Sequence, residues 1–219
     1  MISPRVATPI LAACLTLLLG ACSSDSTAPQ SGHASAVVKD NPNSTSPSAR
    51  MARSTELTPS ADYRATSQSI TGSAASSFSG SMTSTMQVAI SVDGQSWIDL
   101  GSPVQSTLQL QSADNSTTLA TQATVPVGTY AYVRLTLQGA DARVTGSFAG
   151  IAYTDAQVSV GDGGQCVIEK QVRPFTITAG GNATVVFDVN SELWLTAQSV
   201  QSQTAAAAEM EAAAAAGVE

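Results

Sequence analysis

Residues 125–138 read Val-Pro-Val-Gly-Thr-Tyr-Ala-Tyr-Val-Arg-Leu-Thr-Leu-Gln, and this stretch decides the fold class. From Thr129 to Gln138, apolar side chains alternate with tyrosine or polar side chains. A period of two is the pattern of a β-strand with one buried and one more polar face. Pro126 presets the backbone for the second position of a turn and Gly128 suits the fourth, so the chain reverses just before this strand.

The same period of two recurs on both sides of this strand. It is found in residues 86–92, 104–110, 119–125 and 185–189. Between these runs lie Gly, Asp, Asn and Pro residues that favour turns, and no amphipathic helix of ten or more residues interrupts them. An α/β fold with a parallel sheet needs such helices. Residues 78–196 are therefore predicted to form one all-β domain, an antiparallel β-sandwich.

Asp93-Gly94 lies between two of these runs and predicts a hairpin. A two-residue loop pairs Ile90 with Trp97 on the core face, so Trp97 is predicted to be buried. A three-residue loop instead brings Ile98 and Leu100 to that face, because a register shift of one residue turns every side chain over. Asp-Gly favours the two-residue loop, and this is the pairing that we expect.

The N-terminus has the features of a bacterial lipoprotein signal. A short basic segment, Met1–Arg5, precedes an apolar run that is too short to span a membrane. Leu19-Gly20-Ala21-Cys22 resembles a lipobox, in which the cysteine thiol is acylated and becomes the mature N-terminus. We predict a signal peptide at residues 1–21 and a lipid on Cys22, which anchors the protein to the membrane without spanning it. Leu11-Ala12-Ala13-Cys14 also fits the pattern, but apolar residues continue after it.

The segments on either side of the predicted domain differ from it in composition. Residues 22–77 are rich in Ser, Thr, Pro and Asn and show no persistent period, so we expect a disordered tether. Ser23 rather than Asp follows Cys22, and bacterial sorting rules then predict an outer-membrane lipoprotein that is periplasmic or surface-exposed. Residues 197–219 are rich in Ala, which favours helix, but carry almost no apolar stripe. We expect a loosely helical, dispensable tail there.

Composition excludes several classes of function. The chain has 219 residues, a formal net charge of −7 and a pI near 4.5, whereas proteins that bind nucleic acid carry basic patches. The only histidine, His33, falls in the predicted tether, so no histidine cluster can hold a metal ion. Cys166 is the only thiol in the predicted domain, and without a histidine base we expect it to be a buried structural thiol. No catalytic residue, metal or cofactor is predicted.

One strand face is the candidate for binding. Tyr130, Tyr132 and Arg134 occupy alternate positions, on the face opposite Val133 and Leu135. Two tyrosine rings beside an arginine can stack on sugars or grip a partner, whereas a covering sheet would make the same stripe part of the packing. We predict a non-enzymatic, lipid-anchored envelope protein with a binding or structural role, its partner a glycan or an envelope protein. The alternative is a module that binds carbohydrate or envelope polymer through this face, which exposed rings favour and buried rings remove.

Two segments resemble a known family. They are Val-Pro-Val-Gly-Thr-Tyr-Ala-Tyr-Val-Arg-Leu at 125–135 and Arg-Pro-Phe-Thr-Ile-Thr-Ala-Gly-Gly-Asn-Ala-Thr-Val-Val-Phe-Asp-Val at 173–189. Both are similar to bacterial lipoproteins of an uncharacterised domain-of-unknown-function family with a prealbumin-like (transthyretin-like) β-sandwich. The resemblance spans residues 84–196 and implies that sandwich fold. The family has no established catalytic residues, so it assigns none to this chain.

Overall fold

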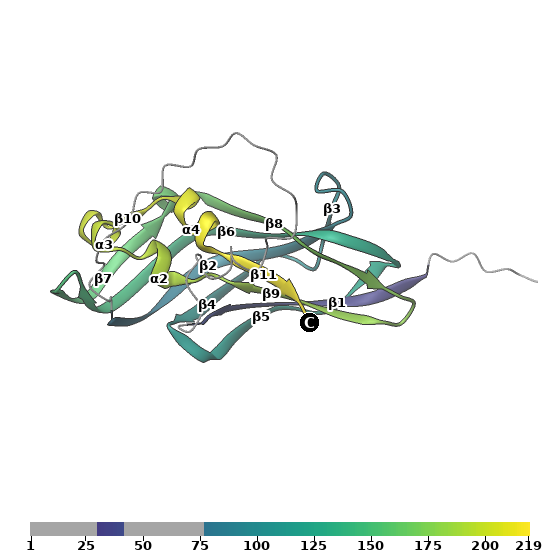
Figure 1. Ribbon diagram of the computed structural model, residues 1–219, viewed down its shortest axis with the longest axis horizontal. Helices are drawn as coiled ribbons and strands as arrows, with labels where there is room; N and C mark the ends of the chain where they lie inside the picture. Colours follow the sequence, from purple (N-terminus) through teal and green to yellow (C-terminus); the bar gives the residue numbers. More distant parts are fainter. Residues whose placement is uncertain (1–29, 42–76) are drawn as a thin grey trace, which may run out of the picture.

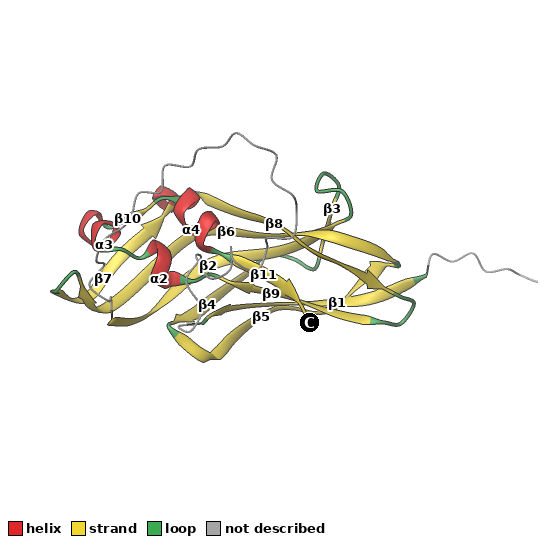
Figure 2. Cartoon of the chain, viewed as in Figure 1, coloured by secondary structure: helices red, strands yellow, loops and turns green. Residues whose placement is uncertain are grey.

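In the computed structural model, which describes residues 30–41 and 77–219, most residues belong to β-strands (Figure 2). The strands form two sheets that share one hydrophobic core, and short helices from the C-terminal part pack beside them (Figure 1). The predicted all-β sandwich is confirmed. The alternation of small or apolar residues with polar ones explains it, because each strand turns one set of side chains toward the opposite sheet.

The larger sheet has seven strands and is built around two long ones, β2 and β6. Its order is β10-β7-β6-β2-β3, with β4 also pairing with β2 and β8 also pairing with β6. β2 has 15 residues and β6 has 21, so each is long enough to pair with two further strands at different positions. These partners are β3 and β4 for β2, and β7 and β8 for β6. The bounds are β2 (Ser77–Ser91), β3 (Trp97–Asp99), β4 (Val104–Leu110), β6 (Gly128–Phe148), β7 (Ile151–Val160), β8 (Gln165–Ile177) and β10 (Thr204–Ala205).

The smaller sheet has four strands in the order β11-β9-β1-β5. The bounds are β1 (Ser31–Asp40), β5 (Ser112–Pro126), β9 (Asn182–Asp188) and β11 (Ala215–Val218). β1 runs antiparallel to β5 but parallel to β9, and β10 is also parallel to β7. The sheets are therefore mixed, and the prediction of a purely antiparallel sandwich is wrong on this point. A parallel pair needs a long connection, which β1 and β9 have because they lie far apart in the sequence.

The prediction of a disordered tether over residues 22–77 is wrong for residues 31–40, which form β1 in the middle of the smaller sheet (Figure 1). The burial of β1 alternates with a period of two, and its inward positions are Gly32, Ala34, Ala36, Val38 and Asp40. These side chains are too small or too polar to give a hydrophobic pattern in the sequence. Residues 1–29 and 42–76 of the predicted signal peptide and tether, Cys22 included, lie outside the described residues.

The C-terminal segment is partly helical, as expected, but it is packed rather than loose. It contains α3 (Ala197–Ser202) and α4 (Ala207–Ala213) between strands of both sheets, and α2 (Ser191–Trp194) precedes it. Met210 in α4 is fully buried, and β11 pairs with β9 from Ala215 to Val218. One large apolar side chain among small alanines is enough to dock α4. The apolar stripe that the sequence seemed to lack is therefore Met210 flanked by Ala207 and Ala214.

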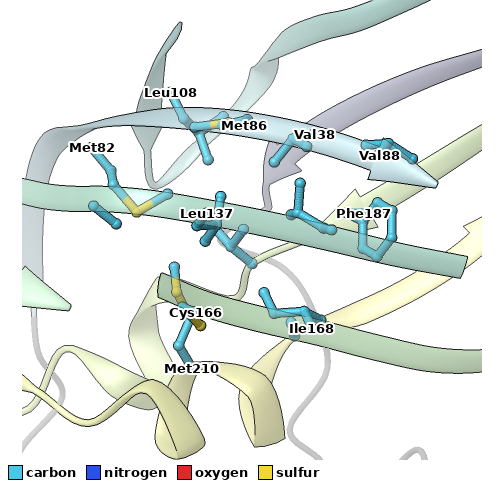
Figure 3. Packing of buried hydrophobic residues seen from close by; sticks show 14 of the residues in the cluster. Val38, Met82, Met86, Val88, Leu108, Leu137, Cys166, Ile168, Phe187 and Met210 are labelled. Carbon is cyan, nitrogen blue, oxygen red and sulfur yellow. The ribbon is translucent and has the colours of Figure 1, made fainter. Parts of the chain in front are cut away.

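The core lies between the sheets and continues under α4. Met82, Leu137 and Phe187 meet there from β2, β6 and β9, and Val38 of β1 joins them (Figure 3). Trp194 of α2 is the largest fully buried side chain, and its indole N–H donates to the carbonyl of Val189 at 3.1 Å. A buried indole needs such a partner for its N–H.

Candidate functional site

Of the three residues of the predicted binding face, Tyr130 lies apart from Tyr132 and Arg134. Tyr130 is buried, with 1% of its surface exposed, and its ring packs 5.8 Å from that of Phe175. Its hydroxyl donates to the carbonyl of Pro126 at 2.7 Å. The pairing of β6 with β8 shifts register between Tyr130 and Tyr132, where an advance of two residues along β6 lies opposite an advance of four residues along β8, from Phe175 to Gln171. The assignment of Tyr130 to an exposed face is therefore wrong.

Tyr132 lies on the outer face but beneath the loop that joins β2 to β3. This loop comprises residues 92–96, and a Cβ atom on Gly94 would lie 3.3 Å from the Tyr132 ring. Gly94 has a φ of +73°, a conformation that glycine adopts without strain. Tyr132 is half-buried and supports the loop from below.

Asp93 holds this loop in shape through its side chain. Its carboxylate accepts hydrogen bonds from the backbone N–H groups of Gln95 and Ser96 at 2.9 and 2.8 Å, and from the Ser91 hydroxyl at 3.0 Å. The hydrogen bond from Ser96 lowers the pKa of Asp93 most, and the bond from Gln95 lowers it further, below its ordinary value of 3.8. The predicted turn at Asp93-Gly94 exists, but it is an Asp-capped loop of five residues rather than a two-residue hairpin.

The longer loop changes which residues of β3 face the core. Ile90 pairs with Ile98, and Trp97 pairs with Ser91. Leu100 is buried while Trp97 is only half-buried, so the predicted burial of Trp97 on the core face is wrong. A loop with an odd number of residues produces this register, in which Ile98 and Leu100 face the core.

Trp97, Tyr132, Arg134 and Glu169 instead share the outer face of the larger sheet, and we call them the Trp97 patch. The Arg134 guanidinium lies 3.8 Å from the centre of the Trp97 ring, within the range of a cation–π contact. The same guanidinium forms an ion pair with Glu169 at 2.7 Å, and both side chains are partly exposed, at 29% and 46%. The patch combines an aromatic ring, a cation and an anion on rigid neighbouring strands.

Sequence reasoning found Arg134 and Tyr132 but missed Trp97 and Glu169. Ala89 pairs with Arg134, and Arg134 pairs with Glu169, so these side chains lie in one row across the sheet. Ser91 pairs with both Trp97 and Tyr132 in the next row. Had a loop with an odd number of residues been predicted at Asp93-Gly94, Trp97 would have been placed on this face.

A second polar cluster is buried where β1 ends. Asp40 is fully buried, and its carboxylate accepts hydrogen bonds from the backbone N–H groups of Gln111 and Ser191, at 2.6 and 2.8 Å, and from the Ser191 hydroxyl. The Gln111 side chain in turn donates to that hydroxyl at 3.0 Å. With several donors directed at one carboxylate, the cluster fastens the end of β1 to α2 and to the turn at Gln111 between β4 and β5.

Cys166 is buried, as the sequence predicted. Its thiol lies 3.7 Å from the carbonyl oxygen of Ala207, and Met210 packs nearby (Figure 3). Burial raises the pKa of the Cys166 thiol, and the negative charge of Glu211 raises it further. A thiol in these surroundings stays protonated and unreactive.

Other titratable groups are dispersed. His33 lies on β1, with its Nδ1 atom 3.3 Å from the carbonyl oxygen of Gln122. Within residues 30–41 and 77–219, no group of three or more His, Cys, Asp or Glu side chains is placed to hold a metal ion. In the same residues, no helix is long and apolar enough to cross a membrane.

Two hollows flank the C-terminal strand β11. One, of 550 Å³, lies between β8 and β9 and is lined by Arg173, Phe175, Asn182, Val218 and Glu219 among others. The other, of 340 Å³, is lined by Lys39, Asp188 and backbone of β11. Both are open grooves beside an edge strand rather than enclosed cavities.

Comparison with known proteins identifies a family. The model of a family described as "Domain of unknown function (DUF4382)" matches residues 66–205, which is more than half of the chain. Curated proteins and solved structures give no match. The matched residues include the Trp97 patch but exclude β1 and β11.

Proposed function

The chain belongs to the DUF4382 family, whose description names no activity, and we propose that it is a lipid-anchored outer-membrane lipoprotein that binds a partner rather than catalysing a reaction. The observation that carries this proposal is Leu19-Gly20-Ala21-Cys22 at the end of an apolar, signal-like run. Acyl chains on Cys22 would hold the protein at the membrane, with the domain in the periplasm or at the cell surface.

The position of β1 adds a geometric consequence to this proposal. Ser31 follows Cys22 by nine positions, and a fully extended chain of that length spans only about 30 Å. At the start of β1, Gly180 N donates to Ser31 O and Val127 N donates to Gln30 O, both at 3.0 Å. The turns that contain Val127 and Gly180 would therefore face the membrane. The opposite end, with α3 and β10, would point away from it (Figure 1).

Substitution of the proposed lipid site tests the anchor. In the full chain, Cys22→Ala should block lipoprotein processing and release the protein from the membrane fraction, as globomycin should also block its processing. Cys14→Ala is the matched control, because it removes a cysteine from the other lipobox-like sequence and should leave processing unchanged. Unaltered processing and fractionation of Cys22→Ala would contradict the proposal.

A second candidate function, the binding of a glycan or envelope polymer, is favoured by the Trp97 patch. Sugar rings stack on aromatic faces, and arginine and carboxylate groups bond their hydroxyls. Here Trp97 and Arg134 are already in contact, and both belong to paired strands that fix their positions. The patch therefore offers a preorganised surface, which lowers the entropy lost on binding. Tyr130 has no part in it, and Tyr132 contributes by supporting the loop.

Binding to isolated peptidoglycan and to purified outer-membrane polysaccharide tests this second candidate. Trp97→Ala and Arg134→Ala should each weaken binding by about tenfold or more, as expected for central aromatic and arginine contacts. Arg143→Ala is the matched control, because Arg143 lies on the same strand and forms an exposed ion pair with Asp155 at 2.9 Å. Failure of the unsubstituted protein to bind either polymer, or equal binding by all variants, would exclude a glycan site at this patch.

A further inference from the structure

β1 is central to the smaller sheet although it comes from a distant part of the chain. It pairs with β5 from Ser31↔Pro126 to Asp40↔Ser112, and with β9 from His33↔Asn182 to Lys39↔Asp188. Without β1, the sheet divides into β11-β9 on one side and β5 on the other, with a strand-wide groove between them. The groove is therefore completed by a segment that lies upstream of the matched family domain, which starts at residue 66.

The connection from β1 to β2 does not require the strand to come from the same copy of the chain. Residues 41–76 join the two strands, and 36 residues span up to about 120 Å when fully extended. The distance between neighbouring domains is smaller than this reach, because a domain of this size is roughly 40 Å across. Hairpins such as β6–β7, which are joined by two residues, have no such freedom.

β1 is held mainly by its backbone. Its fully buried apolar side chains are Ala34, Ala36 and Val38, which are small and bury little apolar surface. Hydrogen bonding on both edges supplies most of the attachment, which is the mode by which an added peptide strand binds a sheet.

The two ends of β1 make the groove specific for this segment. A Cβ atom on Gly32 would lie 2.4 Å from Ile177 Cγ2 and 2.5 Å from the carbonyl oxygen of Thr178, so only glycine fits there. At the other end, the Asp40 carboxylate is required by the donors of Gln111 and Ser191. Glycine and aspartate eight positions apart fix both the register and the direction of the occupant.

We propose that the groove between β5 and β9 is a strand-binding site that accepts Ser31–Asp40 from a second copy of this chain. All contacts of β1 are the same whether the strand comes from its own copy or from a neighbour, so exchange changes only the path of residues 41–76. Reciprocal exchange gives a dimer, and successive exchange gives a chain of copies. The groove accepts this segment rather than any extended peptide, because it recognises the glycine at one end of the segment and the aspartate at the other.

Disulfide trapping between copies tests the exchange in residues 23–219, the chain without its signal peptide and without Cys22. Val37 of β1 and Thr118 of β5 are directly paired, so one copy carries Val37→Cys and the other carries Thr118→Cys. After mixing and oxidation, a covalent heterodimer should form and increase with protein concentration. The double variant Val37→Cys/Thr118→Cys is the positive control and should crosslink within one chain.

A matched pair in a local hairpin completes the design. Thr83→Cys and Thr107→Cys on separate copies should give no heterodimer, because β2 and β4 pair within one copy and their hydroxyls lie 3.1 Å apart. If the Val37→Cys and Thr118→Cys copies form no more covalent heterodimer than the Thr83→Cys and Thr107→Cys copies, the proposal is overturned. Failure of the double variant to crosslink would overturn it as well, because β1 would then not occupy the groove.

Peptide complementation gives a second, independent measurement. Gly32→Val in the full chain should expel its own β1, and a peptide with the sequence of residues 30–41 should then raise the melting temperature of this variant. The same peptide with Gly32→Val should have no effect. If the variant fails to fold, the unsubstituted peptide should restore β-sheet circular dichroism. An equal response to both peptides, or to neither, would contradict a strand-binding groove.

Discussion

The two sheets of the sandwich are assembled in different ways. The larger sheet includes two hairpins of successive strands, β2–β3 and β6–β7, and adds to them the pairings of β2 with β4 and β6, of β6 with β8 and of β7 with β10. The smaller sheet joins β1, β5, β9 and β11, which are spread over residues 31–218. Local pairs are fixed by the turn between them, whereas distant pairs must be fixed by contacts that the strands themselves carry.

This difference teaches where stabilising contacts are concentrated. The distant strands of the smaller sheet are fastened at their ends by specific groups, such as the Asp40 carboxylate and the close fit at Gly32. The larger sheet holds its outer face with exposed ion pairs and a capped loop. Substitutions at the distant-strand contacts should therefore lower the free energy of unfolding more than equivalent substitutions in the local hairpins.

The largest effect is expected at Asp40. Asp40→Asn keeps the size of the side chain but turns an amide N–H₂ toward the Ser191 and Gln111 donors, so about 3 kcal/mol of stability should be lost. Asp155→Asn is the matched control on the larger sheet, and an exposed ion pair there contributes less than about 1 kcal/mol. Chemical denaturation of both variants measures the difference. Equal losses would break the distinction between the two sheets.

Packing of the C-terminal segment should give the next largest effect. Met210→Ala removes the one large buried side chain of α4 and should lower stability by about 2 kcal/mol, at the low end for such a truncation because α4 can settle into the space. Glu209→Ala on the exposed face is the control.

The reactivity of Cys166 reports on the same contact. The raised pKa and the burial of this thiol predict slow alkylation in the native protein at neutral pH. Met210→Ala should speed alkylation, whereas Glu209→Ala should not. Fast modification of the unsubstituted protein would mean that α4 is not docked on β8.

The sequence predicted strands in both sheets where apolar side chains alternate strongly, and the reason is physical. Alternation of this kind marked β2, β4 and β6 of the larger sheet and β5 and β9 of the smaller one, and the fold class followed from it. β1 was missed because its inward residues are Gly, Ala and Val, and β11 because Ala-Ala-Gly-Val reads as helix or coil. Backbone pairing with neighbouring strands decides the structure of such segments. The periodicity of apolar residues in the sequence does not reveal that pairing.

The candidate site was predicted in part for a related reason. Arg134 and Tyr132 followed from the period of two, but Tyr130 did not, because it is buried at the point where the pairing of β6 with β8 shifts register. Trp97 was assigned to the core because the loop after β2 has five residues instead of two. A loop whose length changes by an odd number of residues exchanges the two faces of the following strand, and sequence alone does not fix that length.

Tyr130→Phe should have a smaller effect than either core substitution. It removes only the hydroxyl that donates to Pro126 and leaves the ring packed against Phe175, so about 1 kcal/mol should be lost. Polymer binding, if present, should be unchanged, because Tyr130 does not reach the Trp97 patch. Burial raises the pKa of Tyr130 above 10.0, so its contribution is present below pH 10 and is lost as the pH rises through the folded pKa.

The smallest effect is expected at Asp93, which shapes a local loop on the larger sheet. Its folded pKa is lowered, so its contribution is complete above pH 3.8 and disappears as the pH falls through the folded pKa. Asp93→Ala should lower the melting temperature at pH 7 by less than Tyr130→Phe does, and the difference from the unsubstituted protein should vanish in acid. Asp99→Ala, which removes an exposed carboxylate on β3, is the charge-matched control and should lower the melting temperature at pH 7 less than Asp93→Ala does. A melting-temperature loss at Asp93 as large as that at Asp40 would show that local turns hold this sandwich as firmly as its distant strands do.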